Sequence, residues 1–221
     1  MDKKNIIEAL AKIKESSKKR NFTQSIDLVI NLKELNLKKN DEQVNVFMDL
    51  PHETGKKVKL CALVGNENVE RAKKEFDLVI GESEFAQYQE KKKEFKKIAQ
   101  QHKFFIAQAT IMPKVAKSFG RVLGTKGKLP NPKAGCVVPP NADFSVLKKK
   151  LSKTIKLVAK TELSIKCPIG NEGMSEDHVA DNAVAVYNKV KSALPREENN
   201  IKNMIIKTTM GVPVKVEIKR K

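Results

Sequence analysis

Polar and apolar residues alternate in several segments near both ends of the chain. Alternation over four to eight residues is typical of a β-strand that buries one face and exposes the other to water. The pattern therefore predicts antiparallel strands contributed by both ends of the chain. The alternating segments are residues 22–32, 43–50, 155–160, 162–167, 201–208 and 212–219.

Two helices are predicted beside these strands. Residues 5–18 carry apolar side chains at the spacing of one helix face. Residues 175–194 begin at Ser175, a favoured N-cap, continue with two acidic residues and stop before Pro195. The apolar face of the first helix comprises Ile6, Ala9, Leu10 and Ile13.

The middle of the chain has a different pattern. Three short, nearly continuous apolar runs, typical of strands buried on both faces, are separated by stretches of helical character. Strands and helices in alternation predict a doubly wound parallel sheet. The apolar runs are residues 58–64, 76–80 and 104–109, and the predicted helices are residues 67–75, 83–102, 112–122 and 141–152.

These patterns together predict a discontinuous α+β domain, made from both ends of the chain, with an inserted α/β domain. The inserted domain is expected to be Rossmann-like, with a parallel sheet. We assign residues 1–56 plus 157–221 to the discontinuous domain and residues 57–156 to the inserted one. The two chain crossings, near residues 55–56 and 154–157, would then form a hinge.

The charge of the chain indicates a polyanionic partner. The 221 residues include 44 Lys and Arg against 26 Asp and Glu, for a net charge of +18. Nucleic acid is the commonest partner of so basic a protein. The alternative is a Lys-rich surface without a partner, but such surfaces normally carry a matching number of glutamates. The inserted segment 57–156 has 22 basic and 9 acidic residues, and thus most of the net charge.

The kinds of side chain narrow the class of nucleic acid. Only five of the basic residues are arginines, so the charge consists mainly of point charges that attract a phosphate backbone. The chain has no Trp and only two Tyr, whereas an unspecific single-strand binder needs aromatic stacking platforms. Structured RNA or a duplex is therefore the better expectation.

Several classes of protein and site are disfavoured by the sequence. Three scattered cysteines and three scattered histidines form neither a disulfide framework nor a zinc site, so we expect no metal and no cofactor. No apolar run is long enough to span a membrane, and the charged amphipathic start does not resemble a secretory signal. We expect a cytoplasmic protein. No assembled catalytic group is evident, and neither dinucleotide nor mononucleotide glycine fingerprints occur.

A glycine- and proline-rich loop, LGTKGKLPNPKAG at residues 123–135, carries Lys126, Lys128 and Lys133. Such a loop can present amides and ammonium groups to RNA phosphates, or can be a plain surface loop. Lysine runs at residues 91–93, 96–97 and 148–150 lie in predicted helices, where a solvated helix face is the simpler interpretation.

The segment Thr208-Thr209-Met210-Gly211 separates the last two predicted strands. It lacks the Asn-Gly or Asp-Gly pair of a usual two-residue hairpin turn. Its hydroxyls could meet a ribose 2′-hydroxyl, its methionine could pack on a sugar or base, and its glycine could permit positive φ or close approach. From these residues alone, a turn without any ligand is an equally good interpretation.

Three segments resemble the ribosomal protein L-one family of archaeal type. They are the Thr-Met-Gly turn with its alternating strand, the LGTKGKLPNPKAG loop and the Arg20-Asn21-Phe22 stretch. The resemblance implies RNA contacts at Phe22, at Lys166 and at Thr209 to Gly211, to which we add Thr208. Many relatives have Lys before the phenylalanine, so here Arg20 would supply the charge that Asn21 lacks.

The resemblance also implies a function. Members of this family bind structured large-subunit ribosomal RNA at the stalk beside the exit site, contact exit-site tRNA, and often repress their own messenger RNA. The expected protein is therefore not an enzyme, has no membrane partner, is a monomer when free and acts on cytoplasmic ribosomes. Two alternatives remain open, namely a nucleotide-binding enzyme and a general nucleic-acid chaperone that acts through its lysines.

Overall fold

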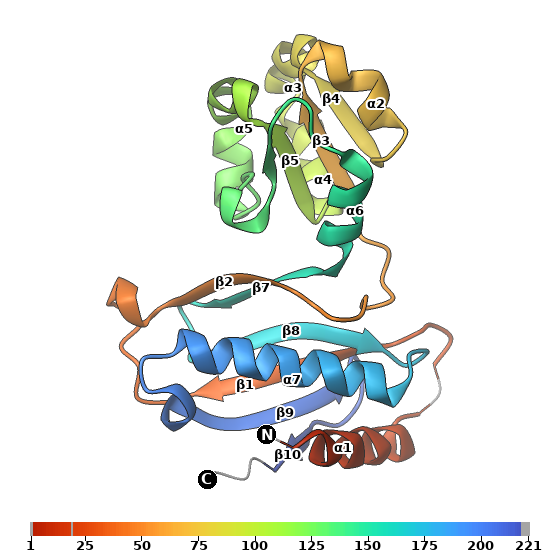
Figure 1. Ribbon diagram of the computed structural model, residues 1–221, viewed down its shortest axis with the longest axis vertical. Coiled ribbons are helices and arrows are strands. Elements are labelled where there is room, and N and C mark those ends of the chain that lie inside the picture. The colour runs from red at the N-terminus through yellow and green to blue at the C-terminus, as the bar shows by residue number, and fades with distance from the viewer. Residues whose placement is uncertain (1, 19, 218–221) are drawn as a thin grey trace. The chain divides into compact units, whose positions relative to one another are not determined.

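The structure is a computed structural model that describes residues 2–18 and 20–217 (Figure 1). The described residues form two compact units, one made of the chain up to Lys56 and from Lys153 onward, the other of Lys57–Ser152. The second unit is therefore an insertion into the first. The predicted α+β fold with an inserted α/β part is confirmed.

The main sheet of the first unit has four antiparallel strands in the order β10-β9-β1-β8. Buried and partly buried residues alternate along β1, as the sequence pattern predicts. The described part of the last strand is shorter than expected, and the predicted strand residues 218–219 lie outside the described residues. The strands are β1 Ser25–Leu32, β8 Ser164–Asn171, β9 Ile201–Thr208 and β10 Val214–Val216.

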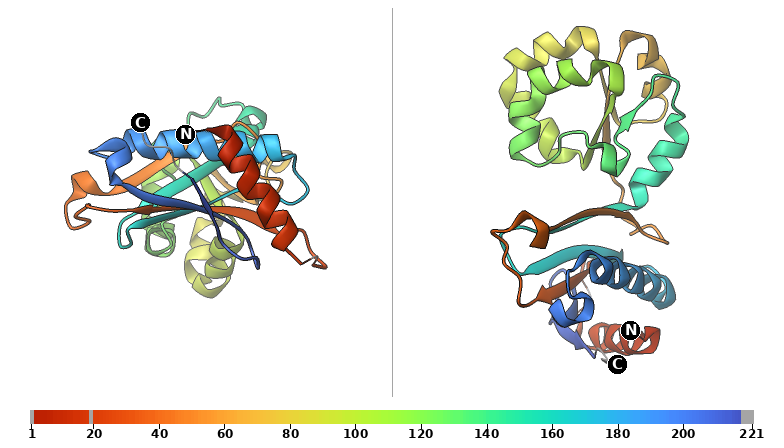
Figure 2. Two further views of the ribbon diagram at one scale, coloured as in Figure 1. Left: turned by 90° about the horizontal axis from the view of Figure 1, so that it is seen from below. Right: turned by 60° about the vertical axis from the view of Figure 1, so that its left-hand side comes forward.

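Two helices cover one face of this sheet. The right-hand view of Figure 2 shows α1 (Lys3–Ser16) and α7 (Glu176–Ala193) on the same side of the strands. The apolar stripe of α1 joins the inward residues of the sheet in one core. Ser175 caps α7 by accepting a hydrogen bond from the His178 amide, as predicted. The alternate positions of β1 face away from this core and stay partly accessible.

A second, two-stranded sheet completes the first unit. Strand β2 (Val44–Asp49) pairs antiparallel with β7 (Thr154–Ala159), and the Thr154 hydroxyl donates to Asp49 at 2.6 Å. Because β7 pairs along its whole length with β2, residues 153–156 belong to the first unit. The unit boundary therefore lies four residues before the expected position 157.

The inserted unit contains a parallel sheet in the order β4-β3-β5-β6. All residues of β3 and β5 are buried, which explains their uninterrupted apolar runs. The two-residue strand β6 was not predicted, because it is too short to show a pattern within its glycine- and proline-rich surroundings. The strands are β3 Leu60–Val64, β4 Leu78–Gly81, β5 Phe104–Gln108 and β6 Val137–Val138.

Five helices accompany this sheet. The single helix predicted over residues 83–102 is interrupted at Lys91, whose backbone is not helical. The rings of Phe95 and Phe119 stack at 4.3 Å between α4 and α5 and are buried. The helices are α2 Val69–Lys73, α3 Phe85–Glu90, α4 Lys92–Gln101, α5 Met112–Thr125 and α6 Phe144–Lys153. Short 3₁₀ helices occupy Asn40–Glu42, Asn66–Asn68, Glu82–Glu84, Ala109–Ile111, Pro132–Ala134 and Glu197–Asn200.

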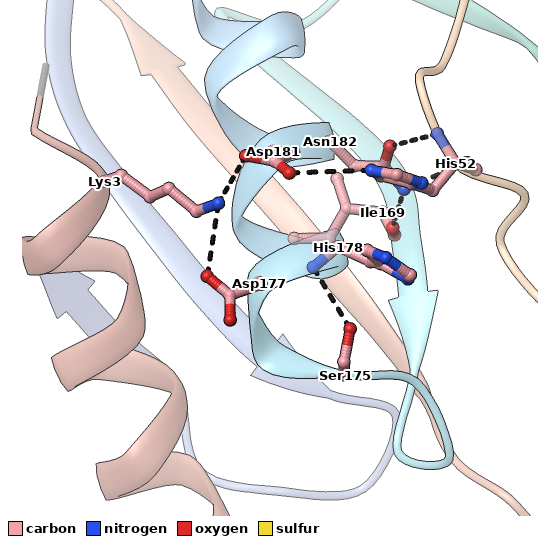
Figure 3. A network of polar contacts seen from close by, with 8 residues as sticks. All are labelled: Lys3, His52, Ile169, Ser175, Asp177, His178, Asp181 and Asn182. Atoms are coloured by element: carbon pink, nitrogen blue, oxygen red, sulfur yellow. Dashed lines mark hydrogen bonds and ion pairs between the residues drawn. The ribbon is translucent and has the colours of Figure 1, made fainter.

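The segment that leads out of β2 is fastened to its own unit by a buried amide (Figure 3). The Asn182 Oδ1 atom accepts a hydrogen bond from the His52 amide at 3.0 Å, and Nδ2 donates to the carbonyls of His52 and Ile169. Asn182 is fully buried, so its unpaired amide would be costly. These bonds fix where the chain leaves the first unit.

Ionic contacts surround this amide (Figure 3). Lys3 of α1 pairs with Asp181 at 2.6 Å and with Asp177 at 3.2 Å on α7. The hydrogen bond from Lys3 holds the pKa of Asp181 below its ordinary value. The His52 ring stacks on His178 with centroids 3.9 Å apart. The contacts join α1, α7 and the outgoing segment.

Candidate nucleic-acid interface

The Thr208–Gly211 segment forms a tight turn. The Gly211 amide donates to the Thr208 carbonyl at 3.2 Å, the i to i+3 bond of a β-turn. Gly211 does not have a positive φ. A Cβ atom there would instead lie 2.1 Å from the Thr208 Oγ1 atom. Glycine is therefore needed for close approach, the second of the two reasons expected from sequence.

Thr208 does not contribute its side chain to the surface. Only 2% of it is exposed, because strand alternation places it on the same inward phase as Met204 and Ile206. Its hydroxyl is buried and has no hydrogen-bond partner among the described residues. In this structure the Thr208 hydroxyl is therefore buried and not presented at the surface, where we expected it to meet RNA.

Thr209 is exposed and also clamps the turn to β1. Its amide donates to the Ser25 carbonyl at 3.0 Å, and its Oγ1 atom accepts from the Ser25 amide at 3.2 Å. The hydroxyl also lies 3.3 Å from the Ser25 carbonyl, to which it can donate. A hydroxyl has one proton and two lone pairs, so one lone pair stays available to an external donor.

Large apolar side chains are exposed at the same end of the sheet. Met210 is 60% exposed, Val212 62% and Phe22 50%. Phe22 lies before β1 in the chain, not in the strand as expected, and Gln24 two residues later binds the Met210 amide at 3.1 Å. Exposed apolar groups beside a rigid turn are suited to packing on a sugar or base.

Gln24 is a positioning residue that the sequence interpretation missed. It is 1% exposed, and its amide NH₂ donates to Glu172 at 2.7 Å and to Ser17 at 3.3 Å. It thereby joins the end of α1, the segment after β8 and the Met210 amide. The sequence does contain a signal for this role. Gln24 continues the alternation of core-facing residues in β1, and a polar residue that faces the core needs buried hydrogen-bond partners.

Lys166 lies away from the turn. It is opposite Val29 of β1, four residues from the Ser25–Asn171 pair that marks the turn end of the sheet. That spacing is roughly 13 Å along a strand. Its Nζ atom pairs with Glu162 at 2.8 Å, and this hydrogen bond lowers the pKa of Glu162. The structure therefore does not bring Lys166 together with Thr209 and Met210, although both it and the turn belong to the first unit.

The main sheet nevertheless connects the two positions. Lys166, Val29, Ile205 and Lys215 form one row across β8, β1, β9 and β10. The row occupies the strand positions that do not point into the core. Both lysines of the row are exposed, as is Arg20 in the segment before β1.

Lys128 has a structural role that the sequence interpretation did not foresee. Its Nζ atom donates to the carbonyls of Ala99 and His102 at 2.8 and 2.7 Å, at the C-terminus of α4. Burial lowers the pKa of Lys128, and the nearby Lys126 lowers it further. An ammonium group held by helix-end carbonyls must leave them to bind a phosphate, so the structure favours a capping role for Lys128 over the expected phosphate contact.

The start of the 123–135 loop is held by the hydrogen bonds that cap the C-terminus of α5. Gly127, with φ of 61°, follows α5, its amide donates to Gly124, and the Lys128 amide donates to Leu123. These two bonds form the Schellman arrangement that commonly ends helices. Lys133 is exposed and Lys126 partly so. These two lysines remain the candidates for phosphate contact in the loop.

Other kinds of site are not found among the described residues. They contain no group of three His, Cys, Asp or Glu side chains placed to hold a metal ion. Within residues 2–18 and 20–217, no helix is both long and apolar enough to cross a bilayer. The three cysteines are buried, and burial raises the pKa of Cys136 to about 11 and of Cys167 to about 12.

The fold and its surface define a basic α+β protein with an inserted α/β unit and an exposed, glycine-dependent turn at one end of its main sheet. Residues 13–212 match the ribosomal protein L1p/L10e family, and the chain belongs to this family, which consists of structural ribosomal proteins and not of enzymes. The family resemblance that the sequence motifs indicate is therefore confirmed, and the enzyme alternative is set aside.

Proteins of archaeal type are similar over nearly the whole chain. A large ribosomal subunit protein uL1 of Nanoarchaeum equitans is 40% identical over 203 residues, covering 90% of this chain and 93% of its own. The protein of the same name from Thermoplasma volcanium is 36% identical over 216 residues, covering 98% and 97%. That from Thermococcus kodakarensis is 37% identical over 218 residues, covering 98% of each.

Proposed function

We propose that this protein is a structural component of the large ribosomal subunit in the cytoplasm, where it binds a folded site on ribosomal RNA. The observation that carries the proposal is the turn at Thr209 and Met210. Its backbone is held by Ser25 and Gln24, while the methionine side chain stays 60% exposed. A rigid surface that exposes an apolar group loses little entropy on binding.

The turn offers groups that distinguish RNA from DNA. The Thr209 hydroxyl keeps an acceptor lone pair while its other bonds go to Ser25, and a ribose 2′-hydroxyl can donate to it. Met210 and Phe22 supply apolar surface for a sugar or base. Arg20 and Lys166 supply charge for the phosphate backbone, the latter at a distance along the sheet.

Further partners follow from the family resemblance. The inserted unit carries most of the excess of basic residues, and its exposed lysines would attract a second RNA, which we assign to exit-site tRNA. Binding of the protein's own messenger RNA at the ribosomal RNA surface would repress its translation. The free protein would act as a monomer in both roles.

A competition experiment tests the proposal. The full chain is bound to a labelled fragment of large-subunit ribosomal RNA at fixed salt, and unlabelled fragment, scrambled RNA of equal length and duplex DNA compete. The ribosomal fragment should compete far better than the other two. Equal competition by all three would instead indicate a chaperone that acts through its lysines and would contradict the proposal.

A further inference from the structure

A cavity of about 240 Å³ lies inside the first unit and reaches the 208–211 turn at Thr208. Its wall comes from the second half of α1 and the residues just after it, from β1 and the end of β9, and from the start of α7 with the segment that leads into it. The wall is mainly aliphatic, so it favours a flat apolar body over a hydrated ion. The apolar lining residues are Leu10, Ile13, Ile26, Met174 and Val179.

The cavity shares residues with the network that holds the turn. Glu172 lines it and accepts hydrogen bonds from the side chain and the backbone amide of Gln24, at 2.7 and 3.3 Å. Ser17 also lines it and accepts a third bond from Gln24. Gln24 in turn accepts from the Met210 amide. A group bound in the cavity would therefore lie next to the proposed RNA surface.

Polar atoms of the wall select the kind of group that fits. An ionised carboxylate has about four acceptor sites, so Glu172 keeps some beyond those that Gln24 uses. The Thr208 hydroxyl, 2% exposed as a residue, has no hydrogen-bond partner in the described part of the chain. Glu176 is paired with Lys14 at 2.7 Å, which compensates its charge. That hydroxyl is covered, so the wall offers the unused acceptors of Glu172 and the ammonium group of Lys18, which also lines the cavity.

A carboxylate next to an RNA surface repels phosphates, and its favourable RNA partners are N–H groups on base edges. Guanine has two adjacent N–H donors on its Watson–Crick edge, which match the two oxygens of a carboxylate. Its neighbouring carbonyl can accept from an ammonium group such as that of Lys18, which also lines the cavity. The other bases lack this pair of adjacent donors.

We propose that the cavity receives one unstacked guanine base of the RNA that the turn binds. The inference rests on the proposed function, because the base belongs to that RNA. The volume suits a single base, since pockets for whole drug-sized ligands begin at about 300 Å³. Splayed-out bases are the usual means by which proteins read RNA sequence. The turn then recognises the RNA backbone while the cavity recognises one base.

Kethoxal modification tests the inference, since this reagent adds to N1 and N2 of guanines whose Watson–Crick edge is free. The RNA is the large-subunit ribosomal RNA fragment that the full-length protein protects from ribonuclease. The wild-type protein should protect from kethoxal one guanine that lies outside the RNA helices. In Met174→Trp, which fills the cavity, that guanine should react again and affinity should fall roughly tenfold, as for loss of one stacked base.

Two further variants keep the test decisive. Met48→Trp is the matched control, because Met48 packs against the same core from β2 and does not line the cavity. It should leave both protection and affinity unchanged. Ser17→Phe closes the cavity from its partly exposed rim if Met174→Trp does not fold. In this variant the reactivity of the guanine decides, and not the affinity, because the Ser17 hydroxyl also accepts a hydrogen bond from Gln24.

Each other outcome has a definite meaning. If a folded Met174→Trp or Ser17→Phe protein binds the RNA and protects the same guanines as before, the cavity holds no base. The cavity also holds no base if the wild-type protein protects no unpaired guanine from kethoxal. Failure of the unmodified protein to prefer ribosomal RNA would defeat the proposed function itself. Free guanosine monophosphate that displaces no RNA but shifts the melting temperature would identify a free nucleotide, and not an RNA base, as the occupant.

Discussion

The Thr209 hydroxyl forms hydrogen bonds with the backbone of Ser25 and remains exposed at the surface, where it can bind RNA. Thr209→Val keeps the shape and the backbone bond to Ser25 but removes the hydroxyl. Loss of a hydrogen bond to ribose should weaken binding by about 1–3 kcal/mol, or roughly 5- to 150-fold, at fixed salt. Binding is measured by titration of a ribosomal RNA fragment, with little change expected in melting temperature.

Thr125→Val is the control for this measurement. Like that of Thr209, the Thr125 hydroxyl bonds to backbone groups, here the carbonyls of Val122 and Arg121 at 3.0 and 3.2 Å, but it lies at the end of α5 in the inserted unit. It should leave the affinity for ribosomal RNA unchanged. Unaltered affinity in Thr209→Val as well would show that the turn hydroxyl meets no RNA.

Gly211 is constrained by one neighbouring atom, the Thr208 Oγ1 atom. Gly211→Ala should therefore destabilise the protein by about 1–3 kcal/mol, the usual cost of overpacking, and weaken RNA binding by distorting the turn. Adding Thr208→Ala removes the clashing oxygen, and the nearest remaining atom, Thr208 Cβ, lies at an acceptable 3.4 Å. The double variant should recover most of the lost stability in thermal unfolding.

A double-mutant cycle makes this test quantitative. Thr208→Ala alone should have a modest effect, because its hydroxyl has no partner among the described residues. Purely additive effects of the two changes would mean that some contact other than Thr208 requires the glycine.

At the scale of elements, Gln24 joins α1, the segment after β8 and the turn after β9. Gln24→Leu keeps the volume but leaves the Met210 amide and Glu172 without their partner. Buried polar groups left unpaired cost about 1–3 kcal/mol, so the free energy of unfolding and the RNA affinity should both fall. Denaturant unfolding and RNA titration measure the two effects.

Gln43→Leu provides the comparison for Gln24→Leu. Gln43 is partly buried, whereas Gln24 is fully buried, and its side-chain amide donates to a single backbone carbonyl, that of Leu37, at 2.9 Å. The change should lower stability slightly and leave RNA affinity as it was. If both variants weaken RNA binding equally, Gln24 does not act specifically on the turn.

Two lysines of the 123–135 loop should behave differently. Lys133 is exposed, whereas Lys128 holds the last carbonyls of α4. Lys133→Gln should lower the slope of log affinity against log salt by about 0.7–0.9, because one phosphate contact is lost. Lys128→Gln should leave that slope unchanged and should cost about 1 kcal/mol of stability through loss of the helix cap. An unchanged slope in Lys133→Gln would assign the loop to the bare surface.

At the scale of the whole molecule, the inserted unit should be dispensable for specific RNA recognition. The segment that leaves the first unit runs beside the segment that re-enters it, where the Leu50 amide donates to the Lys153 carbonyl at 3.0 Å. A short Gly-Ser linker from Lys56 to Lys153 should therefore leave a folded protein. It should still prefer ribosomal over scrambled RNA, with a smaller salt dependence because many lysines are removed.

Circular dichroism establishes folding of this deletion variant before binding is measured. A folded variant that no longer distinguishes ribosomal from scrambled RNA would place the recognition surface in the inserted unit. It would also contradict the role proposed for the turn.

The sequence by itself determined the elements with a clear period. Strand alternation and helix spacing depend only on which face a residue turns to the core, so β9, α7 and the buried runs of β3 and β5 could be predicted. It also determined the insertion, since antiparallel and parallel strands require different patterns. The short strand β6 and the break at Lys91 could not be predicted, because neither changes the local hydrophobic pattern.

Only the tertiary structure decided what each candidate side chain does. The motifs predict that Thr208 and Lys128 are available to RNA, yet one points into the core and the other caps a helix formed by an earlier segment of the chain. No motif includes Gln24, yet its side chain holds the turn through hydrogen-bond partners up to 186 residues away in the chain. Hydrogen bonds and close contacts between distant segments leave no period in a sequence, so residues that share a motif can have opposite roles.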